Sequence, residues 1–475
     1  MTVVNQNIDR SISELHPRDV MNPSIFKAYD IRGESPSEIG PAETGRIAAA
    51  LTRLHQPKTV VVGYDMRKTS IELEQALVES FTAHGVQVVR IGLCTTPMFN
   101  FAIAEASGAY DLGVMVTASH NPAKYNGLKI TRHDNSAIGQ GSGMEELRDL
   151  CCSDEPIPRG STRGDVQDDT GILDRYLEKI WRTAGLQSSI EDWQIAIDAG
   201  NGMEGIVLPK LAKRLGATVH DLYWKLDGNF PHHEANPVKT ETLHDLQQKV
   251  VSKGCAFGAA FDGDADRVGF VDELGQTIQG DILTALFAQE ILHQVPGATI
   301  LYDLRSTKAI KDVVEELGGT AIMCGVGHAG IKKRMHETQA VFAGELSMHF
   351  YFSEFNYCEA SDYAMLLLIR IIQRHNKPLS EIWKPLQRYA HSGERNFQVR
   401  DTQAVLTLVE KHFAMEAKEI SHLDGIRLDF GDWWFSLRAS NTEPLIRLNL
   451  EAGNSRVMEQ KVELVRACFA SLILA

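Results

Sequence analysis

The chain has 475 residues, of which 43% are apolar and 23% charged, a composition typical of a folded protein with several domains. Its formal net charge of −14 argues against a general nucleic-acid binder or a protein of anionic membranes, although it leaves room for a local basic pocket. Residues 1–20 are polar and mixed in charge, and no apolar run of about 18 residues occurs. The seven cysteines are scattered, with no CxxC pair. We therefore expect a cytoplasmic protein with reduced thiols that binds neither nucleic acid nor membranes.

Short apolar strands that alternate with helices form a pattern that occurs three times along the chain. The first copy predicts strands at 59–63, 86–91 and 112–116 and helices at 70–84 and 98–106. The second copy predicts strands at 194–197, 218–223 and 256–261 and a helix at 207–215. The third copy predicts strands at 299–302, 321–324 and 340–343 and helices at 308–317 and 331–337. Such alternation indicates right-handed crossovers and mainly parallel or mixed sheets.

The chain after residue 386 has a different pattern, with strands expected at 395–399, 426–430, 434–438 and 445–451 and helices at 404–417 and 457–474. We predict the α/β class: three similar α/β domains with mixed sheets, then a smaller α+β domain, arranged around a central cleft. The expected boundaries are 1–165, 166–275, 276–386 and 387–475, with a hinge at 386–394. Ligands of such sheets bind beyond the carboxyl ends of strands, and the third strand of each copy ends in a polar loop.

The loop of the first copy reads V-T-A-S-H-N-P-A-K-Y-N-G-L-K-I over residues 116–130. Pro122 stops the strand and leaves the Ser119 hydroxyl exposed at its end. Lys124 and Lys129 would give an anionic group at Ser119 cationic donors. The alternative is a plain turn whose serine and asparagine bond their own backbone.

The loop of the second copy, F-D-G-D-A-D-R at residues 261–267, carries the most specific chemistry in the sequence. Asp262, Asp264 and Asp266 can converge oxygen ligands on one hard divalent cation, which would also relieve their mutual repulsion. A calcium-binding EF-hand fits poorly, since Arg267 stands where that loop needs glycine. We predict a magnesium site, with a purely structural turn as the alternative.

Two further loops complete the set of candidates. Glu345, Ser347 and His349 alternate in G-E-L-S-M-H-F and could bind a polyhydroxy ligand such as a sugar, or could form a solvated strand edge. The loop R-A-S-N-T-E-P at 438–444 could cradle a phosphate, or could be a polar hairpin turn. Its candidate phosphate ligands are Arg438, Ser440, Asn441 and Thr442.

Glycine patterns support a rival prediction. G-N-G-M-E-G at 200–205 follows a strand and opens a helix, and G-V-G-H-A-G at 325–330 matches the same dinucleotide fingerprint. An NAD-dependent oxidoreductase is thus a remote alternative, but it would leave Ser119, the aspartates and the Arg438 loop without a role.

The four loops in this order, T-A-S-H-N-P, D-G-D-A-D-R, G-E-L-S and R-A-S-N-T-E-P, resemble those of the α-D-phosphohexomutases. The resemblance includes Y-D-I-R-G at 29–33 and extends into the C-terminal domain. G-E-L-S followed by histidine, together with R-A-S-N-T-E-P, is closer to the phosphomannomutase/phosphoglucomutase branch than to phosphoglucosamine mutases, which typically have G-E-Q-S-G. In one place the chain departs from the family: residues 357–362, Y-C-E-A-S-D, replace the usual Asp-Ser-Gly or Asp-Asp-Gly.

The resemblance implies a phosphomannomutase that interconverts mannose 6-phosphate and mannose 1-phosphate and also acts on glucose phosphates. Ser119 would be a phosphoserine, hexose 1,6-bisphosphate the intermediate and activator, and one Mg²⁺ per subunit would bind Ser119, Asp262, Asp264 and Asp266. The other catalytic residues would be Lys129, Arg267, His349, Arg32 and His120. Sugar-binding residues would be Glu345, Ser347, His328, Arg305 and Tyr29.

The same resemblance implies that Arg438, Ser440, Asn441 and Thr442 bind the phosphate that does not react. Either Lys129 or His349 would move the proton of the sugar hydroxyl. The ligands would be hexose phosphates, and the protein a monomer or weak dimer. Alternatives are a phosphoglucomutase, a phosphoglucosamine mutase, a magnesium phosphatase with Asp262 as nucleophile, and a catalytically silent sugar-phosphate sensor.

Overall fold

The computed structural model describes residues 21–186, 189–439 and 445–474, and the chain divides into two compact units. Unit 1 comprises Met1–Thr277 and His349–Leu379, and unit 2 comprises Ile278–Met348 and Ser380–Ala475. Within the described residues, no helix combines the length and the apolar character that a membrane span requires.

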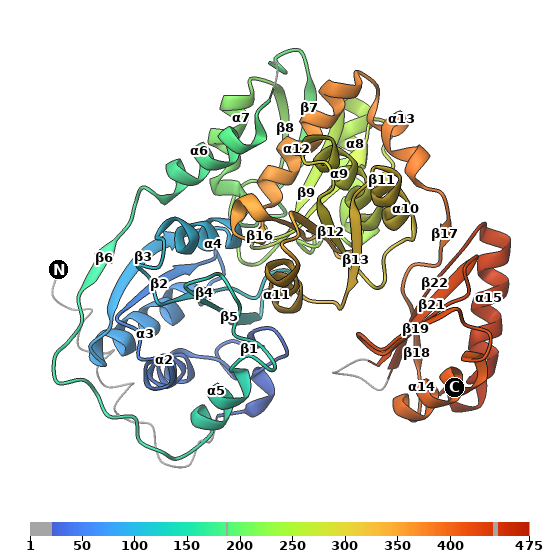
Figure 1. Cartoon of the computed structure of the whole chain (residues 1–475). Coiled ribbons are helices and arrows are strands. Elements are labelled where there is room, and N and C mark those ends of the chain that lie inside the picture. Colours follow the sequence, from blue (N-terminus) through green and yellow to red (C-terminus); the bar gives the residue numbers. More distant parts are fainter. Residues whose placement is uncertain (1–20, 187–188, 440–444, 475) are drawn as a thin grey trace. The chain divides into compact units, whose positions relative to one another are not determined.

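The first sheet of unit 1 is mixed and has six strands in the order β1–β5–β4–β2–β3–β6 (Figure 1). They are β1 (Ile31–Glu34), β2 (Thr59–Tyr64), β3 (Gln87–Leu93), β4 (Leu112–Val116), β5 (Tyr125–Arg132) and β6 (Val166–Asp168). Strand β2 is parallel to β3 and β4, whereas β5 is antiparallel to β4 and to β1. The carboxyl end of β4 therefore lies beside that of β2 at one edge of the sheet.

Helices cover both faces of this sheet. They are α2 (Pro41–His55), α3 (Ser70–Ala83), α4 (Thr96–Glu105) and α5 (Met144–Cys151). Helices α2, α3 and α5 share one apolar core with alternate residues of β2, such as Val60 and Val62. Helix α2 begins with a proline, and the Glu43 carboxylate accepts the backbone N–H of Gly40 at 3.0 Å, which caps the helix.

The second sheet of unit 1 contains β10–β9–β7–β8. Its elements are β7 (Gln194–Asp198), η2 (Met203–Ile206), α7 (Leu208–Leu215), β8 (Thr218–Leu222), η3 (Thr240–Leu243), α8 (His244–Lys253), β9 (Phe257–Phe261) and β10 (Val268–Asp272), with β11 (Thr277–Ile278) next along the chain. Strands β7, β8 and β9 are parallel, and β10 pairs antiparallel with β9. The turn between β9 and β10 is the predicted three-aspartate loop.

Unit 1 also contains a helical layer and a small hairpin. These are α6 (Ile172–Ala184), α12 (Ser361–His375), η4 (Ser353–Phe355), and the antiparallel strands β15 (Phe350–Phe352) and β16 (Cys358–Glu359), with η1 (Pro23–Ile25) near the start of the described chain. Helix α12 packs against α6 and contacts β10. Twelve consecutive residues of α12, from Ser361 to Ile372, are buried, so this helix is a central element of the unit.

The glycine-rich segment at 200–205 makes close backbone contacts within unit 1. A Cβ atom at Gly205 would lie 2.0 Å from the carbonyl oxygen of Trp224, and one at Gly202 would lie 2.9 Å from that of Gly263. The segment leads into the short η2 turn, and Met203 donates its N–H to the Gly263 carbonyl at 2.9 Å. Its glycines let the loop pack closely against the aspartate loop.

In unit 2, β12 (Thr299–Asp303) lies between β13 (Thr320–Cys324) and β14 (Phe342–Gly344), and all three strands are parallel. The accompanying helices are α9 (Gly280–Gln294), α10 (Ala309–Glu316) and α11 (His328–Thr338). This is the predicted third copy, and its polar residues again follow the carboxyl ends of the strands.

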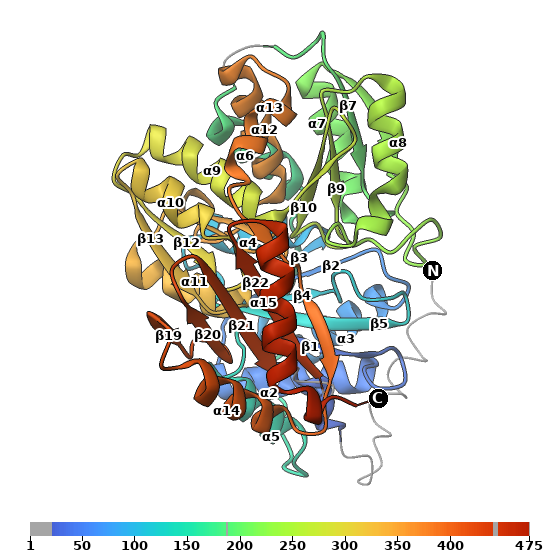
Figure 2. The same ribbon diagram turned by 90° about the vertical axis from the view of Figure 1, so that its right-hand side faces the viewer.

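The rest of unit 2 is an antiparallel sheet in the order β17–β22–β21–β20–β19, with β18 also paired to β22. Its elements are α13 (Leu379–Trp383), η5 (Lys384–Leu386), β17 (Ala390–His391), β18 (Arg395–Gln398), α14 (Thr402–Phe413), β19 (Glu419–Ser421), β20 (Ile426–Asp429), β21 (Trp433–Ala439), β22 (Leu445–Ala452), α15 (Ser455–Cys468) and η6 (Ala470–Leu472). Figure 2 shows α15 lying along this sheet. The predicted class, three α/β domains followed by a smaller α+β domain, is confirmed.

The predicted helix at 457–474 is wrong at its C-terminal end. Helix α15 stops at Cys468, and the following residues return to the sheet, where Ile473 bridges to Val399 and Leu474 donates to the Gln398 carbonyl at 2.9 Å. The apolar residues that suggested more helix therefore cover the edge of β18 instead.

Candidate active site

The Ser119 hydroxyl lies in a buried turn that follows β4. Its Oγ donates a hydrogen bond to Oδ2 of Asp262 at 2.8 Å and lies 3.1 Å from Nδ1 of His120. The φ angle of Ser119 is +49°, in the left-handed region that a residue with a side chain adopts only at a cost. Strong contacts are therefore needed to keep this backbone conformation.

Arg67 supplies most of those contacts. Its guanidinium donates to the carbonyls of Ser119 at 2.7 Å and Asn121 at 2.6 Å, and also to those of Pro122 and Tyr125. The side chain is buried and forms an ion pair with Asp65 at 3.2 Å. The sequence analysis missed this residue, although its position just after β2, beside β4 at the same sheet edge, was an available signal.

Arg32 holds the same turn from β1. Its Nη1 donates to Oδ1 of Asn121 at 2.5 Å and to the carbonyl of Ala118 at 3.3 Å, and its Nε donates to Asp30. Arg32 was predicted to be a catalytic residue. Its hydrogen bonds to Ala118 and Asn121 orient the Ser119 turn. Tyr29 lies three residues before Arg32 in the same segment, and it was predicted to bind sugar.

Asp262, Asp264 and Asp266 converge as predicted, with one carboxylate oxygen of each within 4.8 Å of the others. Burial, together with repulsion from Asp266 and Asp264, raises the pKa of Asp262 well above its usual range. Oδ1 of Asp264 is buried and accepts no hydrogen bond from the described residues. Excess negative charge, a buried oxygen without a donor and three hard ligands fit a divalent cation such as Mg²⁺.

Lys129 extends from β5 into this cluster. Its Nζ lies 2.6 Å from Oδ2 of Asp264 and 2.6 Å from Oδ2 of Asp266. Burial lowers the pKa of this ammonium, but the two carboxylates raise it by more, so its pKa is raised overall and the group stays charged. Lys129 therefore neutralises part of the aspartate charge.

Arg267 and His349 also lie beside the cluster. Nε of Arg267 donates to Nε2 of His349 at 3.1 Å, and the same nitrogen of His349 lies 3.3 Å from Oδ1 of Asp266. Repulsion from Arg267, together with burial, lowers the pKa of His120 well below its usual range, so the imidazole next to Ser119 is neutral. Unit 1 thus brings together all six predicted catalytic residues: Ser119, Lys129, Arg267, His349, Arg32 and His120.

Unit 2 carries the residues predicted to bind the sugar, apart from Tyr29. Glu345 is buried at the turn after β14, where its Oε1 accepts the backbone N–H of Gly327 at 3.1 Å and lies 3.8 Å from Nη2 of Arg305. Arg305 also donates to Asp303 at 2.8 Å. Ser347 follows in the same turn, and His328 is the first residue of α11. Glu345 is therefore not on a solvated strand edge, whereas Ser347 and His349 are half-buried.

Arg438 lies near the end of β21, where its Nε donates to Oδ2 of Asp424 at 2.7 Å. Its side chain remains partly accessible, with 13% of its surface exposed. The other three predicted phosphate ligands, Ser440, Asn441 and Thr442, lie outside the described residues.

Family models for the four domains of the phosphoglucomutases/phosphomannomutases match this chain in order. The α/β/α domain I matches residues 23–149, domain II 174–275, domain III 279–389 and the C-terminal domain 394–467. The chain belongs to the phosphoglucomutase/phosphomannomutase family. The predicted α-D-phosphohexomutase resemblance is therefore confirmed.

Similar proteins include a phosphomannomutase of Methanocaldococcus jannaschii, 37% identical over 94% of this chain and 98% of the relative. A protein of Xanthomonas campestris described as phosphohexose mutases is 36% identical over 93% of this chain and 98% of the relative. The crystal structure of a phosphoglucomutase/phosphomannomutase family protein from Burkholderia thailandensis superimposes with a TM-score of 0.86 at 31% identity, covering 95% and 98% of the two chains.

The segment that departs from the family pattern is well ordered by polar contacts. Glu359 is buried and accepts a hydrogen bond from Nδ2 of Asn100 at 3.3 Å. Ser361 starts helix α12 and donates to the carbonyl of Ala265, while Asp362 accepts from the hydroxyl of Tyr176 at 2.6 Å. In this chain, helix α12 therefore begins at Ser361, within the divergent segment, although the residue before it makes no side-chain cap.

Proposed function

We propose that this chain is a phosphomannomutase that interconverts mannose 6-phosphate and mannose 1-phosphate, and that it also acts on glucose phosphates. The observation that carries the proposal is the Ser119 hydroxyl, held 2.8 Å from Asp262 at the edge of a three-carboxylate cluster. Relatives at 36–37% identity that are named phosphomannomutase support mannose phosphates as the substrates. A cytoplasmic location and a monomer or weak dimer belong to the same proposal.

In this proposal Ser119 Oγ carries a phosphoryl group. A hydroxyl oxygen of the hexose phosphate attacks the phosphorus, the bond to Ser119 breaks, and hexose 1,6-bisphosphate forms. After the bisphosphate turns end over end, Ser119 Oγ attacks the other phosphorus and releases the isomeric monophosphate, so no phosphate is lost. Mg²⁺ held by Asp262, Asp264, Asp266 and a phosphoserine oxygen would neutralise charge on the transferring group.

The protein's own residues have distinct roles in these steps. Arg267 places a guanidinium beside the aspartate cluster, where it can pair with phosphoryl oxygens. Neutral His120 is within hydrogen-bond distance of Ser119 Oγ, and Arg32 and Arg67 keep the turn in place. Lys129 and His349 are the two candidates for moving the proton of the sugar hydroxyl, and the charged Lys129 ammonium would have to give up its own proton before it could accept that one.

We further infer that Glu345 and Ser347 bind the 3- and 4-hydroxyls of the sugar, with Arg305, His328 and Tyr29 lining the site. The loop of Arg438, Ser440, Asn441 and Thr442 would bind the phosphate that does not react. Because each bisphosphate orientation must fit the same contacts, a hinge at residues 386–394 would let the last domain open and close.

The test is phosphoryl labelling combined with activity. Wild-type protein incubated with ³²P-labelled hexose 1,6-bisphosphate should yield a labelled peptide that contains Ser119, and Ser119→Ala should lose both the label and the mutase activity. Label on the Asp262 peptide would instead indicate a phosphatase. If the wild type binds hexose phosphate without turnover, so that its activity does not differ from that of Ser119→Ala, the protein is a sensor.

The substrate preference needs a separate assay. Coupled assays with mannose 1-phosphate, glucose 1-phosphate and glucosamine 1-phosphate, each primed with bisphosphate, should give turnover of the first two. Turnover of glucosamine 1-phosphate alone would contradict the proposed branch of the family.

A further inference from the structure

The backbone of the aspartate loop is held by three different parts of unit 1. Three consecutive carbonyls each accept one hydrogen bond: Gly263 from the N–H of Met203 at 2.9 Å, Asp264 from the N–H of Thr96 at 2.9 Å, and Ala265 from Oγ of Ser361 at 2.5 Å. Two of the donors are backbone groups that every residue type except proline possesses. Only the third depends on the identity of a side chain.

Ala265 is the residue in this loop that most needs support. Its φ is +61°, in the left-handed region, although it is not glycine, and it is completely buried. It stands between Asp264 and Asp266, so a rotation of its peptide groups would change the directions of both carboxylates. A carbonyl at this position with no donor would be both strained and unsatisfied.

Ser361 is well placed to prevent that rotation. It is 1% exposed and is the first residue of α12, a helix whose next residue is anchored by the hydroxyl of Tyr176. If Glu359 takes the place of the aspartate in the family motif, Ser361 falls at its glycine, which has no hydroxyl to donate. The bond to Ala265 is then a feature of this chain rather than of the motif.

We propose that Ser361 is a positioning residue, which sets the directions of Asp264 and Asp266 through the carbonyl of Ala265 and so tunes divalent-cation affinity. The inference rests on the proposed function, because it assumes that the aspartate cluster binds Mg²⁺. Within the described part of the chain, the hydroxyl of Ser361 donates to the Ala265 carbonyl and forms no hydrogen bond with the three carboxylates or with the Ser119 hydroxyl, so its effect passes through the backbone.

The test measures Mg²⁺ binding to metal-free protein by isothermal titration calorimetry, for wild type and for Ser361→Ala. We expect the dissociation constant of the variant to rise about tenfold, since a buried carbonyl loses its donor. At saturating Mg²⁺ the KM for hexose phosphate should remain that of the wild type. Ser361→Thr, which keeps the hydroxyl, should restore the affinity to within about threefold of wild type.

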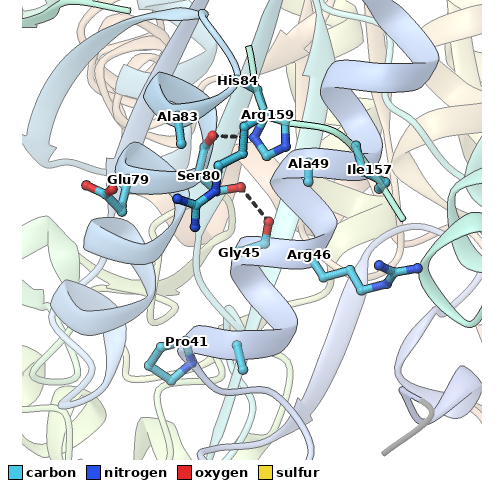
Figure 3. A pocket seen from close by; sticks show the side chains of 11 residues that line it. Pro41, Gly45, Arg46, Ala49, Glu79, Ser80, Ala83, His84, Ile157 and Arg159 are labelled. Atoms are coloured by element: carbon cyan, nitrogen blue, oxygen red, sulfur yellow. Dashed lines mark hydrogen bonds between the residues drawn. The ribbon is translucent and has the colours of Figure 1, made fainter. Parts of the chain in front are cut away.

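Ser80→Ala is the matched control. Ser80 Oγ donates to the carbonyl of Gly45 at 2.6 Å and joins α3 to α2, as Figure 3 shows beside a pocket on the first sheet's helices. The substitution and the type of bond are the same, but the bond has no connection to the aspartate loop. The control should bind Mg²⁺ as the wild type does.

The outcomes separate this inference from the proposed function. If Ser361→Ala binds Mg²⁺ as tightly as Ser80→Ala, or if Ser361→Thr fails to restore affinity, Ser361 does not position the loop. If wild-type protein binds no divalent cation, the metal site of the proposed function is itself wrong, and this inference falls with it. Should the alanine variant not fold, Ser361→Gly, which matches the family motif, is titrated in its place with the same expectation.

Discussion

Replacing Glu204 by glutamine should stabilise this protein at neutral pH, although Glu204 is completely buried. Its carboxyl group faces that of Asp362, which is also completely buried and already accepts the Tyr176 hydroxyl at 2.6 Å. Among the described residues, no N–H or O–H group donates to either oxygen of Glu204 or to Oδ1 of Asp362. One proton on Glu204, donated to Asp362, would satisfy both carboxyl groups.

The electrostatics agree with such a shared proton. Burial, and then repulsion from Asp362, raises the pKa of Glu204 well above its ordinary value of 4.5. Between pH 4.5 and the folded-state pKa, the folded protein keeps a proton that the unfolded chain has lost, so the free energy of unfolding falls as pH rises. The free energy of unfolding falls by about 1.4 kcal/mol per pH unit in this range. By pH 7 the total loss is therefore at most about 3 kcal/mol.

The glutamine amide of the variant can donate an N–H to Asp362 at any pH, so it avoids this loss. Scanning calorimetry at pH 5, 6, 7 and 8 should show Glu204→Gln melting higher than wild type at pH 7 and 8, with the difference shrinking toward pH 5. Glu79→Gln, on an exposed ion pair with Arg163, is the control and should change stability by less than about 0.5 kcal/mol. A Glu204→Gln variant that melts below wild type at pH 7, with an unchanged pH slope, would refute the shared proton.

Three further predictions concern the site. A Cβ atom at Gly263 would lie 2.4 Å from the Ser119 carbonyl oxygen, so Gly263→Ala should push the two loops apart and lower kcat at least about tenfold in folded protein; a fully active variant would contradict the close packing. Arg438→Gln should raise the KM for hexose phosphate about tenfold or more while phosphorylation of Ser119 persists, as steady-state kinetics and labelling would measure. Mg²⁺ at about 100 times its dissociation constant should stabilise the wild type by about 2.7 kcal/mol in thermal melts, and chelation or Asp264→Asn should remove that shift.

The strands of the three copies were predictable because their apolar runs are bounded by polar turns. The strand expected at 112–116 is β4 with the same bounds, and the loop after it carries Ser119. Polar Asn126 and Lys129 hide strand β5 in the sequence, which places these residues in the predicted loop at 116–130. Both are nonetheless buried, since Asn126 donates to the hydroxyls of Thr69 and Ser70 and Lys129 meets two aspartates. These polar side chains can be buried in a strand because residues far away in the sequence form hydrogen bonds and ion pairs with them.

Helix α12 was not predicted for a related reason. Helix α12 is buried nearly all round, so it lacks the alternation of apolar and polar faces that reveals a surface helix. Its first residues, Ser361 and Asp362, are polar but find partners in the aspartate loop and in Tyr176. Neither partner can be identified from spacing along the chain.

The residues proposed to react are thus easier to identify from the sequence than the residues that hold their loops in place. Ser119 and Ala265, one in each of the two reacting loops, adopt left-handed φ angles of +49° and +61°, at a cost of about 1–2 kcal/mol each. Arg67 bonds the carbonyl of the first and Ser361 that of the second, and neither lies in the loop that it holds. A sequence motif contains the residues that contact the substrate. The strained backbone of the motif is stabilised by hydrogen-bond donors from other parts of the fold. In the proposal made above, Ser361 is therefore a position at which related chains with the same four loops can differ in metal affinity.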